Sequence, residues 1–313
     1  MPTPFADEDP SSLLFRLAKH HFITPKILYD RYLGRTFEQF GDVGSRPEIW
    51  EQVETIAGYG IEFIERNGWH HLDRSRLRFR GTTIKRTWLS ERRRVAPGVL
   101  SDDGEQPYAR ITWRFKALPC DVATGEMLIE RCPRCLLPLT WGDMTSIYRC
   151  QECGFDLRKI ERSEASKEMY EAARTIAQMI GLLPSNGVDL SHPFNVEDVG
   201  LRLDLLEWCA AFEGRVRGNW ITRSSTNAWR GVEGAQTWPA LLERAVSLTQ
   251  RKYEKSGSYP DFAKVHLELQ SMPNLDARKA ALLQLADMLR QIGYVRLRRK
   301  QNRSRPKQQQ RTT

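Results

Sequence analysis

The chain has 313 residues, of which 40% are hydrophobic, and it carries a formal net charge of +9 at pH 7. This length and apolar content predict a folded protein of two or three small domains and exclude an intrinsically disordered chain. No run approaches eighteen consecutive apolar residues, and the first ten residues are acidic and polar. The sequence therefore predicts neither a membrane span nor a signal peptide.

The N-terminal 72 residues are expected to be helical. Ser11 and Ser12 can cap a first helix that ends near His20, and Thr24-Pro25 is a strong start for a second helix that ends at Gly34. Two further helices are expected over residues 46–56 and 61–66. The short turn between the first two helices allows either a simple αα-hairpin or a helix-turn-helix, and the αα-hairpin is preferred because two amphipathic helices pack together far more often than they read DNA.

An alternating pattern follows, and it predicts a β-hairpin. Residues 76–80 and 83–88 each alternate apolar with polar or basic side chains, and Gly81 separates them. One face of such a hairpin is apolar and the other basic, which suits either contacts to nucleic-acid phosphates or an ordinary half-buried strand pair. The candidate phosphate contacts in and after the hairpin are Arg74, Arg76, Arg78, Arg80, Lys85, Arg86, Arg92, Arg93 and Arg94.

Four cysteines are the strongest motif of the chain. Cys132-Pro-Arg-Cys135 and Cys150-Gln-Glu-Cys153 are separated by fourteen residues, a spacing typical of a four-cysteine zinc site. Residues 136–141 and 145–149 are expected to form two short strands, which would complete a zinc ribbon. Disulfides or free thiols are the alternatives. Because protein would supply all four ligands, we expect one structural Zn²⁺ and no catalytic metal.

The remainder of the chain is predicted to be helical, with a disordered basic tail. Helices are expected over residues 161–180, 196–212, 238–253, 262–269 and 275–292, with residues 215–229 as a long polar connection. Cys209 fits a small buried helix residue. The tail from residue 295 contains eight Lys or Arg and no acid, so it can attract phosphate or simply improve solubility. Its candidate contacts are Arg296, Arg298, Arg299 and Lys300.

The sequence offers no recognisable catalytic motif. It contains no P-loop, no GxSxG and no HExxH, and no His-x-Glu precedes its cysteines, where zinc deaminases carry that motif. The adjacent histidine pairs at residues 20–21 and 70–71 fit core or surface positions better than ligand sites, because neighbours in a helix or strand point apart. We therefore predict that the protein is not an enzyme.

Taken in order, these features resemble the TniQ family of transposition targeting proteins. The resemblance covers about the first 160 residues: the Ser-Leu-Leu-Phe-Arg helix, the Arg-rich stretch, Ile111-Thr-Trp-Arg114, Cys132-Pro-Arg-Cys135 and Cys150-Gln-Glu-Cys153-Gly. It implies a non-catalytic adaptor that links a target-recognition unit to an AAA+ ATPase regulator of the TnsC type and, through it, to a transposase. The recognition unit in such proteins is either DNA-binding or an RNA-guided CRISPR complex.

The chain departs from the family in one respect. Family members usually carry an earlier zinc finger, with CPxC before the Trp-Arg segment and CPxHG after it. Here Ala96 and Val99 stand in the first two cysteine places, Cys120 reads as the one thiol retained, and residues 121–125 read as a segment that has lost the histidine and gained one residue. We expect this finger to be a metal-free remnant that packing of Trp113 and Phe115 keeps folded.

The predicted architecture is mainly helical α+β. It comprises an N-terminal helical segment (1–72), a zinc-finger region with a degenerate first finger (73–160), a C-terminal helical domain (161–294) and the tail (295–313). The expected location is the bacterial cytoplasm, with association to the nucleoid during activity, and a homodimer is left open. The alternative function is a stand-alone zinc-ribbon regulator that binds DNA without a partner.

Overall fold

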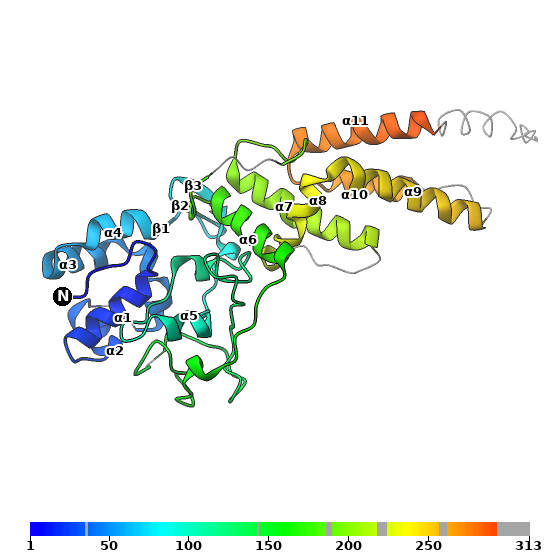
Figure 1. Ribbon diagram of the computed structural model, residues 1–313. Coiled ribbons are helices and arrows are strands. Elements are labelled where there is room, and N and C mark those ends of the chain that lie inside the picture. The colour runs from blue at the N-terminus through cyan, green and yellow to red at the C-terminus, as the bar shows by residue number, and fades with distance from the viewer. Residues whose placement is uncertain (35–36, 143, 186–189, 218–223, 257–261, 293–313) are drawn as a thin grey trace, which may run out of the picture.

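The computed structural model describes residues 1–34, 37–142, 144–185, 190–217, 224–256 and 262–292. The fold is mainly helical with one small antiparallel sheet, as predicted. Figure 1 shows a lobe that contains α1 to α5 and the cysteine segment, from which the C-terminal helices α9 to α11 extend. Within the described ranges, no helix is long and apolar enough to cross a membrane.

The four predicted N-terminal helices are all present. They are α1 (Pro10–His20), α2 (Pro25–Ile27, continued by a π-helical turn, Leu28–Tyr32), α3 (Pro47–Ala57) and α4 (Gly60–Asn67), with a 3-10 helix at Phe37–Ser45. Thr24 caps α2 as expected, but the N-cap of α1 is Asp9 instead of Ser11 or Ser12. Pro10 takes the first helical position, and the Ser12 hydroxyl donates to Glu8 Oε1 instead. Whether α1 and α2 act as a DNA-reading helix-turn-helix stays a prediction.

The sheet has three strands in the order β1-β2-β3. β1 (Trp69–His71) pairs with β2 (Arg76–Phe79), which pairs with β3 (Thr82–Lys85), all antiparallel. The predicted hairpin is therefore confirmed, and Gly81 turns it with φ +79°. β1 escaped prediction because it is only three residues long. The sheet buries Trp69, Leu77, Phe79 and Ile84 and leaves Arg76 and Arg78 on the opposite face.

Six C-terminal helices follow in the described residues. They are α6 (Lys167–Met179), α7 (Val199–Arg217), α8 (Arg230–Gln236), α9 (Trp238–Ser256), α10 (Ala263–Gln270) and α11 (Leu275–Gln291). α6 begins six residues later than predicted, because residues up to Ala165 run extended beside Gly125 and Ser166 then caps the helix.

The helix α8 was missed by the sequence reasoning, which read residues 215–229 as a connection before α9. Its two glycines disfavour a helix in isolation, but they let α8 pack closely on α7. A Cβ on Gly231 would lie 2.1 Å from the backbone carbonyl oxygen of Leu206. Close packing thus outweighs the low helix propensity of glycine here.

Two hydrophobic cores organise the chain. One joins α1 to α4 with α5 (Pro97–Asp102) and the cysteine segment, and the other joins the sheet and residues 111–122 with the C-terminal helices. β3 packs on α7, where Lys85 Nζ lies 2.6 Å from Asp204 Oδ1. Both cores draw on residues 73–160, and the domain boundaries at 72, 160 and 294 stay a prediction.

Candidate metal centre and basic surface

The structure brings the four predicted ligand cysteines together. Their sulfur atoms all lie within 4.8 Å of one another, and those of Cys132 and Cys153, like those of Cys135 and Cys150, are 3.7 Å apart. Four thiolates at about 2.3 Å from a tetrahedral Zn²⁺ would lie about 3.8 Å apart. The sulfurs also lie beyond disulfide distance, since that bond is about 2.05 Å long. The cluster therefore fits a four-cysteine metal site such as a zinc site.

Each cysteine pair lies on a six-residue turn of its own, and the two turns have the same backbone geometry. We call a turn of this kind a knuckle turn. The amide of its first residue donates to the carbonyl of its sixth, and the amide of its fifth donates to the carbonyl of its first. The fifth residue is left-handed, with φ +62° at Leu136 and +66° at Gly154. The two turns, Cys132–Leu137 and Cys150–Phe155, are each closed by a single β-bridge.

The two strands predicted between the knuckle turns do not form. Residues 136–141 and 145–149 contain only isolated bridges, Arg131 with Pro138 and Arg149 with Asp156. Each bridge closes its own turn instead of joining the two halves. The segment is thus held by turns, by the cysteine cluster and by neighbouring residues, and a regular ribbon sheet is absent from residues 130–142 and 144–157.

The turns direct backbone amides at the cysteine sulfurs. Burial alone would raise the pKa of the Cys150 thiol, but hydrogen bonds from the backbone amides of Cys153 and Glu152, followed by contacts with neighbouring thiols, lower it to about 7. In the first knuckle turn, the backbone amides of Cys135 and Arg134 likewise donate hydrogen bonds to the sulfur of Cys132. Such amide hydrogen bonds favour the thiolate, the form that binds metal.

Arg93, a predicted phosphate contact, lies inside the molecule beside the cysteines. Its side chain is 1% exposed, and its guanidinium donates to the backbone carbonyls of Ile147 and Arg149, which precede the second knuckle turn. Burial lowers the pKa of Arg93 to about 10, and the charges of Cys150 and Cys132 oppose that shift. A buried cation so close to the thiols complements the net negative charge of a metal centre with four thiolate ligands.

Arg94 and Arg80 are also engaged in internal contacts. Arg94 is 6% exposed and donates to the carbonyls of Phe115 and Leu118 at 2.6 and 2.9 Å, with its Nε 2.9 Å from Glu130. Arg80 is partly buried and donates to the carbonyl of Arg66 and the side chain of Asn67. Their geometry suits a structural role, so Arg80, Arg93 and Arg94 do not belong to the exposed basic surface.

Five predicted contacts do lie at the surface, and we call them the hairpin arginines: Arg74, Arg76, Arg78, Arg86 and Arg92. Arg76 lies 2.8 Å from Asp73 and Arg86 lies 3.3 Å from Glu91, whereas Arg74, Arg78 and Arg92 have no ion pair within the described part of the chain. Lys85 is held by Asp204 and Glu207 of α7. The candidates of the tail, Arg296, Arg298, Arg299 and Lys300, lie outside the described residues.

The hairpin arginines border a groove of about 1050 Å³ between β3 and the start of α7. Four of them line it, together with Lys85 and Lys116, while Asp198 and Asp204 line the α7 side and Glu91 and Glu130 also contribute. The groove is therefore basic on the hairpin side and acidic on the helix side. An extended phosphate backbone would fit the basic side only.

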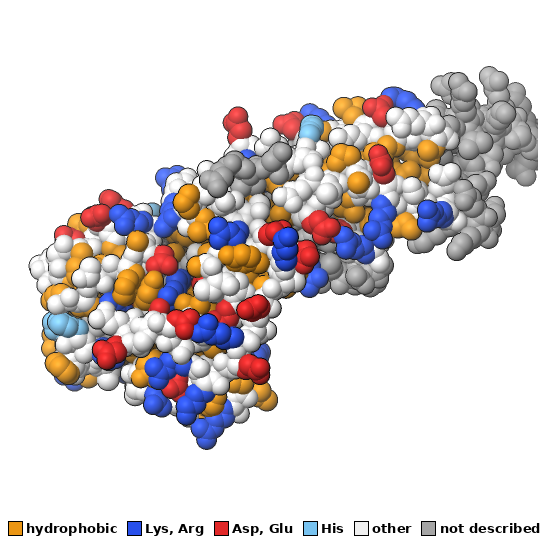
Figure 2. Space-filling view, in the orientation of Figure 1, with side chains coloured by type: hydrophobic (Ala, Val, Ile, Leu, Met, Phe, Trp, Pro, Cys, Tyr) orange, Lys and Arg blue, Asp and Glu red, His pale blue; other side chains and the backbone are white. Residues whose placement is uncertain are grey.

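A second basic region surrounds the knuckle turns, and the sequence reasoning did not single it out. Figure 2 shows Lys and Arg side chains grouped at the lower end of the molecule, where the cysteine segment lies in Figure 1. Arg131, Arg134 and Arg149 are exposed there, beside Leu136, which is 69% exposed. Arg131 and Arg149 each precede a ligand cysteine, and that repeated position is a signal that could have identified them.

The N-terminal part of the chain matches a known protein family. Residues 1–122 match the family model TniQ. This part of the chain is therefore similar to the TniQ family. The match confirms the resemblance for this part of the chain and ends ten residues before the first ligand cysteine. No curated protein matches the chain.

Proteins of the TniQ family have a role as adaptors associated with transposition. TniQ proteins are known as non-catalytic adaptors. The site described above fits that class, because the cysteines can fill every coordination position of a tetrahedral metal and leave none for a substrate.

Proposed function

We propose that this protein is a non-catalytic targeting adaptor of DNA transposition. It joins a target-recognition unit, either DNA-binding or an RNA-guided CRISPR complex, to an AAA+ ATPase regulator and thereby to a transposase. The single observation that carries the proposal is the TniQ match over residues 1–122. The closed cluster of four cysteines supports it, since such a site stabilises a binding module and performs no chemistry.

In this proposal the cysteines hold one structural Zn²⁺. Cys132, Cys135, Cys150 and Cys153 would supply all four ligands, and the ion would replace the hydrophobic core that so short a segment cannot build. Arg93 anchors the same segment to the N-terminal core through two backbone carbonyls. The metal thereby fixes the surface that carries Arg131, Arg134 and Leu136.

The hairpin arginines supply sequence-independent attraction to nucleic acid. Their guanidinium groups are exposed on one side of the molecule, and contacts of this kind fix position on a duplex without reading its bases. Sequence selection would then come from the recognition unit. We propose that the basic tail adds to the same attraction.

The direct test is capture of an AAA+ transposition regulator of the TnsC type. The immobilised protein is expected to retain that ATPase in the presence of ATP and to lose it when C150S removes a metal ligand. E152Q, an exposed non-ligand change in the same knuckle turn, serves as the control and should bind normally. The wild-type protein should contain one zinc per chain by elemental analysis, and C150S none.

Two results would contradict the adaptor role. One is reproducible failure of the zinc-loaded wild-type protein to bind the ATPase. The other is nanomolar, sequence-dependent binding to duplex DNA without any partner, which would identify a stand-alone zinc-ribbon regulator.

A further inference from the structure

A third knuckle turn lies upstream of the cysteines, and it contains no cysteine in a ligand position. In Asp121–Glu126, the Asp121 amide donates to the Glu126 carbonyl at 2.7 Å, and the Gly125 amide donates to the Asp121 carbonyl at 2.8 Å. Gly125 is left-handed with φ +81°, and the turn is closed by a bridge between Cys120 and Met127. All three features occur at the same positions in the turns that begin at Cys132 and Cys150.

This equivalence corrects the alignment expected from the sequence. Asp121, and not Cys120, occupies the place of the first ligand, while Thr124 occupies the place of the second. Cys120 corresponds to Arg131 and Arg149, which precede the ligands. The segment has therefore gained no residue. Spacing alone misled the sequence reasoning because the neighbouring cysteine was the conspicuous residue.

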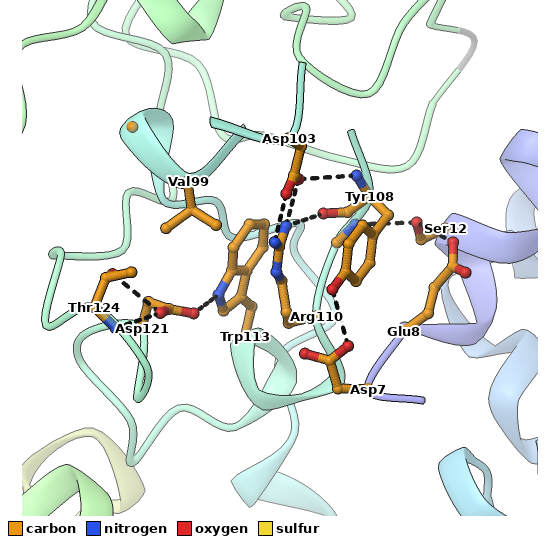
Figure 3. Close-up of polar contacts among 12 residues, drawn as sticks. Asp7, Glu8, Ser12, Val99, Asp103, Tyr108, Arg110, Trp113, Asp121 and Thr124 are labelled. Atoms are coloured by element: carbon orange, nitrogen blue, oxygen red, sulfur yellow. Dashed lines mark hydrogen bonds and ion pairs between the residues drawn. The ribbon is translucent and has the colours of Figure 1, made fainter. Parts of the chain in front are cut away.

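The Asp121 carboxylate takes the place of a thiolate in its turn. Oδ1 accepts hydrogen bonds from the amides of Ala123 and Thr124 at 3.1 and 2.9 Å, and from the Thr124 hydroxyl at 3.0 Å. The amides at these two positions are the ones directed at sulfur in the cysteine turns. Figure 3 shows Thr124 and the Trp113 indole on either side of Asp121, with Trp113 Nε1 donating to Oδ2 at 2.8 Å.

A second carboxylate, that of Glu126, accepts hydrogen bonds from the segment that contains Ala96 and Val99. Glu126 Oε1 accepts from the Gly98 amide at 2.6 Å, and Oε2 accepts from the Val99 amide at 3.0 Å. These amides are two and three residues after Ala96, as the sulfur-directed amides are after Cys132. Asp121 and Glu126 are 2% and 4% exposed, so both carboxylates act in the interior.

We propose that this region is a metal-independent counterpart of the cysteine centre. The carboxylates of Asp121 and Glu126 take the amide hydrogen bonds that metal-bound thiolates take in the other centre, and the Trp113 indole completes the set. The inference rests on the three equivalent turns and not on the role in transposition. Among the residues that the structure describes, the four cysteines are the one group gathered to hold a metal.

The test compares amide hydrogen exchange in the zinc-loaded and chelator-treated protein, resolved by peptide. Removal of the metal is expected to speed exchange at least tenfold in residues 130–157 and to leave residues 96–126 protected. D121N and E126Q are expected to do the reverse, with faster exchange in residues 96–126 and an unchanged zinc content. E105Q is the control, because Glu105 lies in the same region and its side chain is exposed.

Three results would overturn the proposal. They are loss of protection in both regions on chelation, a second equivalent of metal that D121N removes, or unchanged exchange in both D121N and E126Q. If either variant failed to fold, the chelation experiment on the wild-type protein would still decide. Failure of the ATPase capture experiment would leave this result unaffected, so the two proposals are distinguishable.

Discussion

Three arginines that look like surface cations are buried. Arg93 and Arg94 end the basic stretch, and Arg114 lies in the Ile-Thr-Trp-Arg segment, yet each is 6% exposed or less. Each guanidinium donates to backbone carbonyls of irregular segments, and Arg114 also contacts Asp9. A guanidinium has five donors, so one side chain can satisfy several such carbonyls at once.

Arg93→Met tests the anchoring of the cysteine segment. The change keeps the apolar stem but removes the guanidinium that donates to the buried carbonyl of Ile147 and the partly buried carbonyl of Arg149. We therefore expect a loss of about 2–4 kcal/mol in the free energy of unfolding. The affinity for zinc should fall as well, because the thiolates lose a nearby positive charge. Urea unfolding and a competitive zinc titration measure the two effects.

Arg92→Met is the matched control. Arg92 is the neighbour of Arg93 in sequence, is exposed and has no ion pair in the described part of the chain. It should change stability by less than about 0.5 kcal/mol. Equal effects of the two substitutions would show that the internal contacts of Arg93 contribute little.

At the scale of elements, the segment just before α1 contains a buried carboxylate, that of Glu8. Glu8 is fully buried, accepts from the Ser12 hydroxyl and lies 2.6 Å from Arg16. Burial raises the pKa of Glu8 to about 7, and the positive charge of Arg16 offsets only part of that shift. In the unfolded chain the same carboxyl titrates near its ordinary value of 4.5.

This difference predicts a pH-dependent stability. The folded state keeps the Glu8 carboxyl protonated to a higher pH than the unfolded state does. The contribution of this carboxyl to the free energy of unfolding is therefore complete below about pH 4.5 and is lost as the pH rises through about 7. The loss amounts to about 3 kcal/mol at most. In E8Q this part of the pH dependence should disappear, whereas E105Q, at an exposed position, should retain it. Urea unfolding across this pH range checks it, and an unchanged slope in E8Q would refute it.

The sequence predicted elements well where caps and periodicity mark them. Thr24 caps α2 and Pro47 opens α3, as the structure confirms. It failed where packing decides: α8 forms because glycine allows close approach to α7, and residues 161–166 stay extended because they pair with the turn at Gly125. The cysteine cluster was predictable because metal ligation fixes ligand spacing. The roles of Asp121 and Glu126 were not, since carboxylates leave no comparable spacing signal.

At the scale of the whole molecule, the basic side chains divide into buried ones and exposed ones. Of the nine basic residues between Arg74 and Arg94, five are exposed, and they border one groove or lie beside it. The positive net charge of the chain therefore concentrates on the hairpin side of the groove and, in the sequence, on the tail. Such a concentration of positive charge attracts polyanions.

Charge reversal of the hairpin tests this surface. R74E/R76E/R78E should weaken binding to a duplex of random sequence by at least tenfold, and the slope of log affinity against log salt should fall by about 3 in magnitude. K264E/K279E/R290E, which places the same change on α10 and α11, should leave both quantities near the wild-type values. Fluorescence anisotropy between about 50 and 200 mM salt measures them. Equal losses in both triple variants would mean that net charge, and not this surface, determines binding.

The three knuckle turns bear on how a zinc protein can change over generations. Their shared backbone depends on a left-handed fifth residue and two internal hydrogen bonds, and neither requires a cysteine. A lineage can therefore exchange thiols for carboxylates one turn at a time while the backbone of each turn is kept. In this chain the turn at Asp121 holds a carboxylate, and the turns at Cys132 and Cys150 hold thiols. The backbone of the turn, and not its cysteine, is therefore what the three segments share.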